Sequence, residues 1–487
     1  MTKKGNSSSK AGSPSGSGRG RGKNALTFKP AVAWSGLKPA ELKKVDSLSR
    51  DYMAFLNAAR TERETVRELV RIAEKEGFCS LADAKKVTPG DRLYLIHKDR
   101  SITFAVAGKR PLSEGANMVA SHVDCPRLDL KMRPLYGDKD SQTALLRTHY
   151  YGGIRKYHWV NTPLELRGVI YTKDGKRKEV ELDDVRFLVP DLLPHLGKSQ
   201  NEKKLADAFT GEDLQVLAGS RPAKGKHDDP LAMNILEELN RRLGIGEEDL
   251  VSAELTLVPS WDARELGFDR SMIAAYGQDD RVNAFLSLVA LLELKTPDMW
   301  AMAVCYDKEE VGSEGPGGAQ TRMLSSTFGA LMDLEDPNCP DRALRRGLER
   351  SRALSADVKS GVNPLFKSVQ EFQNAAHIGR GPTLTKYTGA RGKSAANDAR
   401  AEFVGHVRGV LNRSKIPFQV SETGKVDEGG GGTVAKFLAR ENMDVVDIGV
   451  PLLSMHSPFE VSSKVDLHCT RRFFTAFFED GSGLNLS

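Results

Sequence analysis

The chain has 487 residues, of which 39% are hydrophobic and 28% are charged, as in an ordinary soluble protein. The chain is longer than a domain with one hydrophobic core usually is, so we expect two domains. No apolar run reaches the roughly 18–20 residues that a membrane-spanning helix needs, and the start lacks the apolar core of a secretory signal. The net charge of +6 is modest and gives no general argument for a nucleic-acid partner.

The N-terminal segment, residues 1–27, is rich in glycine, serine and basic residues. Such a composition cannot bury enough apolar area to fold, so we predict a disordered tail. A weak electrostatic contact with nucleic acid or an acidic surface is the alternative, and a solvated tail is the interpretation we prefer.

The cysteines are odd in number and scattered along the chain, at Cys79, Cys125, Cys305, Cys339 and Cys469. Because no CxxC pair occurs, they indicate neither a disulfide framework nor a thiolate zinc site. A reducing cytoplasm is therefore the simplest location for this protein.

The first half of the chain alternates between helical and strand patterns. Apolar residues recur at three- and four-residue steps over residues 38–77, which predicts helix. Two apolar runs at 92–96 and 102–107 are typical of paired strands, and a third strand at 118–121 ends at His122.

Residues 130–259 have a different texture, with short β-type runs such as 164–171. A polar stretch at 198–229 is interpreted as a mobile excursion. We predict that this region is a mostly β domain, inserted into an α/β domain that residues 28–129 and 260–487 form together.

The α/β rhythm returns in the second half of the chain. We expect, in order, an apolar helix at 282–294, a buried strand at 300–305, a short strand at 353–358, a late strand at 445–456 and a final helix at 465–478.

Acidic and imidazole side chains lie at or near the ends of these elements, at His122, Asp279, Glu310, Asp357 and His456. In an open α/β sheet, ligands bind outside the carboxyl ends of the strands. Such a mixed nitrogen and oxygen set suits a site for two metal ions, with zinc favoured and manganese or cobalt as substitutes.

Two acidic neighbours of these residues have possible roles of their own. Glu309 precedes Glu310, and because adjacent side chains point in different directions, one can bind metal while the other carries protons. Asp124 follows His122 by two residues, so it can accept a hydrogen bond from the second ring nitrogen and fix the tautomer.

Each residue also has a simpler explanation when taken alone. A histidine at a strand end is more often structural, and an adjacent Glu-Glu pair is more often a solvated turn. Asp279 and Asp280 could cap the helix that follows them. Composition and spacing therefore leave both the metal site and these structural roles open.

Five motifs in order resemble those of the M18 family of metalloaminopeptidases: His122-Val123-Asp124, Asp279-Asp280-Arg281, Asp307-Lys308-Glu309-Glu310-Val311-Gly312-Ser313, Ser355-Ala356-Asp357 and Ser454-Met455-His456-Ser457-Pro458. The resemblance runs from about Trp34 to Phe478. It implies an α/β fold, with a three-layer αβα zinc-peptidase domain and an inserted, mostly β dimerisation domain.

The resemblance also implies roles for single residues. Asp279 would bridge two metal ions, with Asp280 as its rival, and Glu309 would be the general base. The ligands of one ion would be His122 and Asp357, and those of the other Glu310 and His456.

The implied function is removal of the N-terminal residue of peptides by a homo-oligomer, in which dimers assemble into a dodecamer. A dinuclear carboxypeptidase or amide deacylase would use the same ligands, and a non-catalytic peptide-binding scaffold is a third hypothesis.

Two further positions match the family. Lys386 corresponds to a lysine near the substrate, and His195 resembles a histidine that reaches the active site of a neighbouring subunit; a local structural role is the alternative for His195. Residues 391–399 depart from the Asn-Gln-Arg-Tyr pattern of the eukaryotic aspartyl enzymes and are closer to a bacterial branch. A preference for acidic N-terminal residues is implied by the family and left open by this departure.

Overall fold

The computed structural model describes residues 26–482, so the predicted disordered tail lies almost entirely outside the described residues. From Ala31 onward the described residues form one compact unit. None of the described helices is both long enough and apolar enough to cross a bilayer. All five cysteines lie within the described residues and are free thiols.

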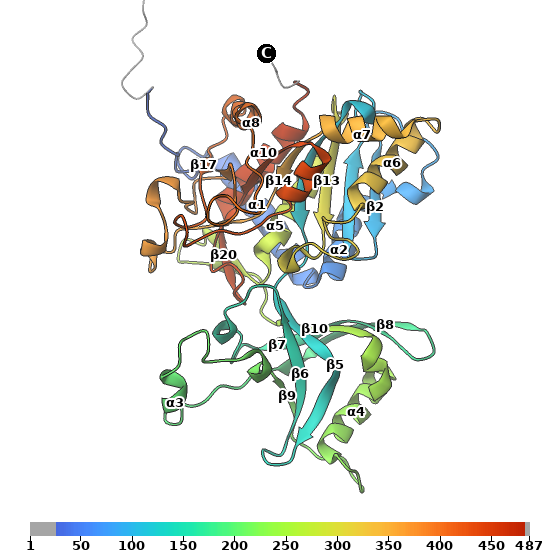
Figure 1. Ribbon diagram of the computed structural model, residues 1–487, viewed down its shortest axis with the longest axis vertical. Coiled ribbons are helices and arrows are strands. Elements are labelled where there is room, and N and C mark those ends of the chain that lie inside the picture. The colour runs from blue at the N-terminus through green and yellow to red at the C-terminus, as the bar shows by residue number, and fades with distance from the viewer. Residues whose placement is uncertain (1–25, 483–487) are drawn as a thin grey trace, which may run out of the picture. The chain divides into compact units, whose positions relative to one another are not determined.

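A nine-stranded sheet forms the centre of the α/β part (Figure 1). Its strands, in spatial order, are β1 (Cys79–Ser80), β2 (Arg92–His97), β3 (Ser101–Val106), β13 (Trp300–Tyr306), β4 (Ala116–His122), β14 (Arg352–Ser355), β18 (Asp444–Gly449), β16 (Thr383–Thr385) and β17 (Gln419–Val420). The four strands from β13 to β18 run parallel, so their carboxyl ends meet at one edge of the sheet.

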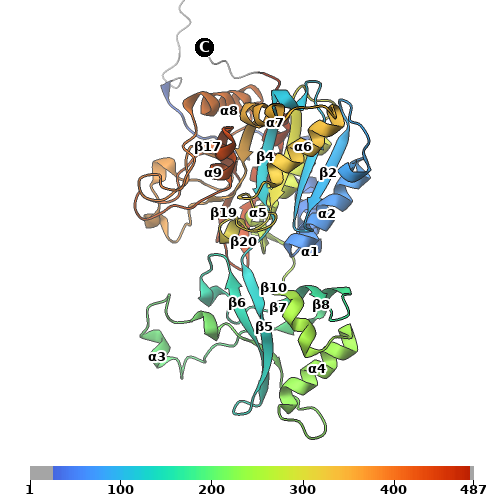
Figure 2. The ribbon, with the colours of Figure 1, turned by 45° about the vertical axis from the view of Figure 1, so that its right-hand side comes forward.

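Helices cover both faces of this sheet (Figure 2). One core contains side chains of α1 (Pro39–Ala58), α2 (Glu62–Lys75), α5 (Gln278–Leu292), α8 (Ala401–Arg413) and α10 (Lys464–Phe478). The other contains side chains of α6 (Met323–Glu335), α7 (Asp341–Arg350) and α9 (Ala435–Leu438). Strand β4 alternates between them, with Val119 in the first core and Met118 in the second. The predicted three-layer αβα fold is confirmed.

The helical pattern over residues 38–77 is interrupted once. α1 ends at Ala58 and α2 begins at Glu62. Between them, the Thr61 hydroxyl accepts a hydrogen bond from the Glu64 N–H, and the Glu64 carboxylate accepts one from the Thr61 N–H. This capping box starts a new helix inside a continuous apolar pattern, which explains why periodicity alone missed the break.

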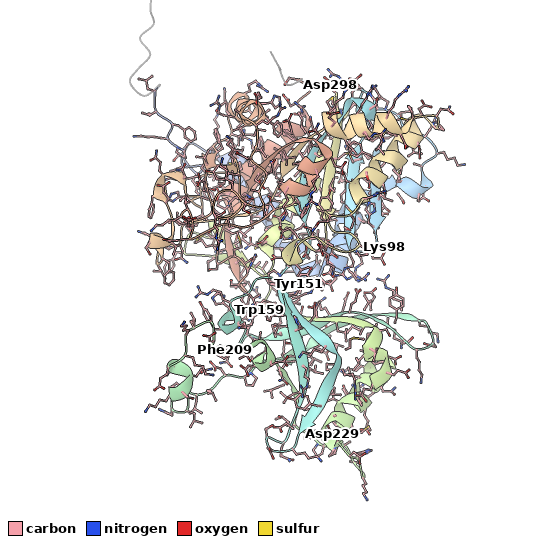
Figure 3. The ribbon with its side chains drawn as sticks, in the orientation of Figure 1. Lys98, Tyr151, Trp159, Phe209, Asp229 and Asp298 are labelled. Atoms are coloured by element: carbon pink, nitrogen blue, oxygen red, sulfur yellow. The ribbon has the colours of Figure 1, made fainter. Side chains whose placement is uncertain are left out.

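Residues 127–259 carry a second, antiparallel sheet, with the order β8 (Arg177–Phe187), β7 (Leu164–Tyr171), β10 (Ala253–Pro259), β5 (Arg127–Asp138), β6 (Thr143–Tyr151) and β9 (Val216–Gly219). It has its own hydrophobic core, which includes the fully buried Trp159 (Figure 3). The stretch at 198–229, expected to be an excursion, supplies α3 (Lys198–Asn201) and β9. Asp229 then caps α4 (Pro230–Leu243), a helix that the sequence analysis did not predict.

A third sheet joins β11 (Arg264–Leu266), β12 (Met272–Ala275), β20 (Glu460–Ser463), β19 (Pro451–Leu453) and β15 (Lys359–Ser360). The prediction of one strand over 445–456 is therefore wrong. The chain leaves the nine-stranded sheet at Gly449, where a Cβ would lie 2.0 Å from the Asp357 carbonyl oxygen. It enters the third sheet at Pro451, and His456 lies in the turn between β19 and β20.

Candidate metal centre and active site

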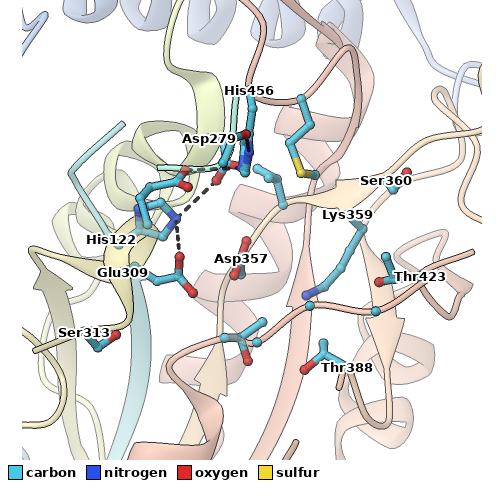
Figure 4. A pocket seen from close by; sticks show the side chains of 18 of the residues that line it. His122, Asp279, Glu309, Ser313, Asp357, Lys359, Ser360, Thr388, Thr423 and His456 are labelled. Carbon is cyan, nitrogen blue, oxygen red and sulfur yellow. Dashed lines mark hydrogen bonds and ion pairs between the residues drawn. The ribbon is translucent and has the colours of Figure 1, made fainter. Parts of the chain in front are cut away.

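The five candidate ligands converge from two sheets. The nine-stranded sheet supplies His122 at the end of β4, Glu310 after β13 and Asp357 after β14. The third sheet supplies Asp279, just beyond β12, and His456 between β19 and β20. All five, together with Glu309, line one cavity of about 460 Å³ (Figure 4). Segments far apart in the sequence thus meet at the carboxyl edge of the parallel strands.

Asp279 lies between the two imidazoles (Figure 4). Its Oδ1 is 3.2 Å from His122 Nε2, and its Oδ2 is 3.1 Å from His456 Nε2. Glu310 Oε1 is 3.3 Å from the same His456 nitrogen. One carboxylate therefore points an oxygen toward each histidine, and Glu310 approaches only the His456 side.

The donor atoms of this cavity fit a divalent cation. Buried polar atoms are almost always hydrogen-bonded in proteins, yet Asp279 Oδ1 and Glu310 Oε1 are buried with no hydrogen-bond partner among the described residues. Ligand atoms of His122, Asp279 and Glu310 lie within 4.8 Å of one another, as do those of Asp279, Asp280 and Asp357. Imidazole nitrogen with carboxylate oxygen is a donor set that zinc accepts.

Asp280 differs from its neighbour in how its oxygens are used. Oδ2 accepts a hydrogen bond from the His122 N–H at 3.3 Å, and Oδ1 accepts one from the Asn283 amide at 2.6 Å. Both oxygens of Asp280 thus have donors, whereas one oxygen of Asp279 has none. This difference separates two adjacent aspartates that the sequence alone could not rank.

Both histidines present Nε2 to the cavity because a carbonyl oxygen holds Nδ1. His122 Nδ1 lies 3.0 Å from the main-chain oxygen of Asp124, and His456 Nδ1 lies 2.7 Å from that of Gly153. A carbonyl oxygen can only accept, so Nδ1 carries the proton and Nε2 keeps a lone pair for metal. The Asp124 carboxylate, predicted to orient His122, is farther from Nδ1, at 3.4 Å.

The Asp124 carboxylate instead contacts the Glu-Glu turn. It accepts hydrogen bonds from the main-chain N–H groups of Glu309 at 3.1 Å and Glu310 at 3.2 Å, and from the Tyr151 hydroxyl at 2.8 Å. Asp124 is fully buried and does not line the cavity. Its carboxylate therefore fixes the backbone on which both glutamates stand.

Burial in the absence of a cation shifts the protonation of this cavity. It raises the pKa of Glu309 to about 8 and that of Asp357 to about 6. Burial alone would lower the pKa of His456, but its contact with Asp279 and the charge of Glu310 raise it to about 11. Protonation of these groups would therefore compete with the binding of a cation.

The two other predicted site residues lie outside the cavity. Lys386 is exposed, and its Nζ is 3.8 Å from Asp398 Oδ1. His195 is also exposed, in the segment between β8 and α3. Neither is among the residues that line the cavity of this chain.

Sequence analysis missed two lysines that do line the cavity, Lys359 and Lys436. Lys359 is 4% exposed, and its Nζ lies 3.8 Å from Asp447 Oδ1. Lys359 begins β15 of the third sheet, and no local pattern in the sequence marks either lysine as a residue of the cavity. Glycines 430–432 also line the cavity, and at Gly430 a Cβ would lie 2.3 Å from the Gly389 carbonyl oxygen.

Comparison with known proteins identifies the family of the chain. The family profile described as "Aminopeptidase I zinc metalloprotease (M18)" matches residues 55–478. A protein of Thermotoga neapolitana called a probable M18 family aminopeptidase 1 is 44% identical, over 90% of this chain and 97% of its own length. One of Clostridium acetobutylicum with the same description is 42% identical, over 94% of this chain and all of its own.

Solved structures give the same result. The M18 aminopeptidase of Thermotoga maritima superposes with a TM-score of 0.89 at 42% identity, over 93% of this chain and 100% of that one. A structure described as the S. cerevesiae mApe1 dodecamer shares the fold, with a TM-score of 0.72 at 20% identity, over 90% of this chain and 97% of that one.

Metal binding should release protons and weaken as the pH falls. His456, with its pKa of about 11, holds a proton that competes with the ion over the whole range from about pH 5 to 8, and Asp357, with its pKa of about 6, holds one only below about pH 6. We expect zinc affinity for the metal-free protein to rise between about pH 5 and 8, by roughly tenfold per unit for each proton displaced. Titration calorimetry in two buffers of different ionisation enthalpy measures the release. An affinity independent of pH would contradict this assignment.

Proposed function

The chain belongs to the M18 family of aminopeptidases, which are zinc metalloproteases, and from that premise we propose that it removes N-terminal residues with two metal ions bound about Asp279. The observation that carries the proposal is the position of Asp279, with one oxygen near each imidazole. One ion would take His122 and Asp357, and the other Glu310 and His456. Zinc is the ion we propose, with cobalt or manganese as substitutes.

Asp279 is the proposed bridge because one of its oxygens has no hydrogen-bond donor, whereas both oxygens of Asp280 accept one. The ions, when bound, would polarise the scissile carbonyl and lower the pKa of a water toward neutrality. The role of the chain is to hold the ligands apart at fixed positions. In particular, the carbonyl oxygens at Asp124 and Gly153 keep each Nε2 free for metal.

Glu309 is the proposed general base. It lines the cavity, and its Oε2 lies 3.9 Å from His122 Nε2, too far for a hydrogen bond that would engage it. Its carboxylate can therefore take a proton from an attacking water and return it to the leaving amine. Asp124 supports this role because it holds the Glu309 backbone. The raised pKa of about 8 would fall when cations bind nearby.

We propose that the cavity prefers acidic N-terminal side chains, and that Lys359 recognises them. Lys359 is a cation on the cavity wall, and its one ion-pair partner among residues 26–482 is Asp447, at 3.8 Å. A carboxylate of a substrate would be a closer partner for the buried ammonium. Lys386 stays a competing prediction from the family, and so does His195 for the cavity of a neighbouring subunit.

The remaining proposals concern assembly and location. We propose that residues 130–259 form a dimerisation domain, and that the dimers assemble into a dodecamer. The support is a sheet with its own core and a run of exposed leucines, Leu192, Leu193 and Leu196, beside His195. A cytoplasmic location is proposed because the five thiols are free.

Metal content and one pair of substrates separate the alternative functions. We expect about two zinc ions per chain by atomic spectroscopy, and release of a free amino acid from an unblocked peptide but not from its N-acetylated form. A carboxypeptidase or deacylase would act on the acetylated form, and a scaffold would bind no metal and release nothing. Either result would overturn the proposed function.

Substitution of the proposed base should separate turnover from metal binding. Glu309→Gln keeps the size of the side chain but cannot take a proton, so kcat should fall by about 10²–10⁴-fold while zinc content is unchanged. Glu314→Gln, an exposed glutamate on the same loop, is the matched control and should keep the parent rate. Parent-like turnover by Glu309→Gln would show that another group is the base.

The acidic preference can be assigned to one of two lysines. In Lys359→Met, kcat/KM for an N-terminal Glu substrate should fall about 10–100-fold, because an ion pair is lost, while the value for a Leu substrate changes little. Lys386→Met, made in parallel, should leave the Glu-to-Leu ratio near that of the parent. If only Lys386→Met changes the ratio, the family assignment is right and ours is wrong.

A further inference from the structure

Glu460, the first residue of β20, contacts two of the proposed metal ligands through their backbones. Its Oε2 accepts a hydrogen bond from the Asp279 N–H at 3.0 Å, and its Oε1 accepts one from the His456 N–H at 2.7 Å. The residue is 1% exposed and does not line the metal cavity. Its carboxylate therefore ties the two ligands together from behind.

Asp279 and His456 lie on separate segments of the chain, whose relative position must be fixed. Asp279 follows β12, and His456 lies in the turn between β19 and β20, so two different connections bring them to the cavity. Strand β20 pairs with both β12 and β19, and Glu460 lies opposite Ala275 at the end of β12. One side chain at this register position reaches both connections.

The position of Glu460 is itself fixed. The side-chain amide of Gln278 donates to the Glu460 carbonyl oxygen at 2.7 Å, and the Ser462 hydroxyl donates to Gln278 Oε1 at 2.6 Å. A buried carboxylate is costly unless N–H groups satisfy it, and here each oxygen has a main-chain donor. Both oxygens must accept, which only a carboxylate can do; an amide of the same shape would turn an NH₂ group toward a donor.

We propose that Glu460 is a positioning residue of the metal centre, which holds Asp279 and His456 at the separation at which both can bind one ion. This proposal rests on the proposed two-ion function, and in it the ion at the His456 side depends on Glu460. Both Asp279 and His456 serve the ion proposed at the His456 side, whereas only Asp279 serves the other. Loss of the two hydrogen bonds that Glu460 accepts should therefore lower the affinity for one ion far more than for the second.

The test is zinc binding by the full-length protein in the variant Glu460→Gln. Metal-free protein is titrated with zinc in competition with a chromophoric chelator. We expect one of the two zinc equivalents to bind at least tenfold more weakly and the other to change less than about threefold. The rise in melting temperature on adding zinc should shrink in parallel, which a purely structural residue would not cause.

Glu335→Gln is the matched control. Its carboxylate also accepts two N–H groups, from the Leu112 backbone at 2.9 Å and from Trp300 Nε1 at 2.9 Å, but it lies outside the metal cavity. This variant should bind both zinc ions as the parent does. Circular dichroism establishes that each variant is folded.

Three outcomes overturn the inference. If the parent and Glu460→Gln bind two ions with equal affinities, Glu460 does not position the ligands. If the affinity for both ions falls equally, Glu460 does not act selectively on the ion at the His456 side. If the parent binds fewer than two ions, the proposed dinuclear function is wrong, which the parent titration alone reveals. Should Glu460→Gln not fold, Glu460→Asp keeps the charge but shortens the reach, and the same loss of one ion is expected.

Discussion

The concentration of buried carboxylates around Asp279 is the constraint on which the rest of the site depends. Each would be costly to bury as an anion without a donor or a cation. They fall into two groups. Asp124 accepts three hydrogen bonds, and Asp280 and Glu460 each have a donor for both oxygens. Asp279 and Glu310 each keep a buried oxygen with no partner among the described residues. The satisfied group holds backbone in place, and the unsatisfied group marks where positive charge is missing.

The end of strand β6, in the second sheet, contacts this centre. Tyr151, the last residue of β6 (Figure 3), donates its hydroxyl to Asp124, while the Arg127 guanidinium lies 4.0 Å over its ring. Gly153, two residues later, holds His456 through its carbonyl oxygen. The same short segment thus supports the Glu-Glu turn on one side of the cavity and a proposed ligand on the other. The proposed dimerisation domain thus contacts residues on both sides of the cavity, so a change at the end of β6 would affect Asp124 and His456 together.

The proposed metal ligands could be predicted from the sequence because they lie near the ends of strands and helices. His122 ends a mostly apolar strand and Glu310 lies a few residues after another, so strand prediction placed them at one edge of the sheet. Asp279 and His456 were harder, since the third sheet is built from strands of two to four residues, too short for periodicity to reveal. Lys359 and Glu460 lie on those short strands, and no local pattern distinguishes them from surface charges. Their positions arise from the pairing of β15 with β19 and of β12 with β20, segments far apart in the chain, which a single sequence does not display.

The different directions of the Glu309 and Glu310 side chains, on which their proposed roles rest, have a local cause. Lys308 has a positive φ of 71°, which turns the chain sharply after β13, and a short 3₁₀ turn over Glu309–Val311 follows. Adjacent residues on such a turn project in different directions, so Glu310 approaches His456 at 3.3 Å and Glu309 faces His122 at 3.9 Å. Asp124 holds both N–H groups, so neither glutamate can exchange places with the other without breaking that contact. The backbone of this pair, which could have been a solvated turn, thus directs the proposed metal ligand and the proposed general base toward different histidines.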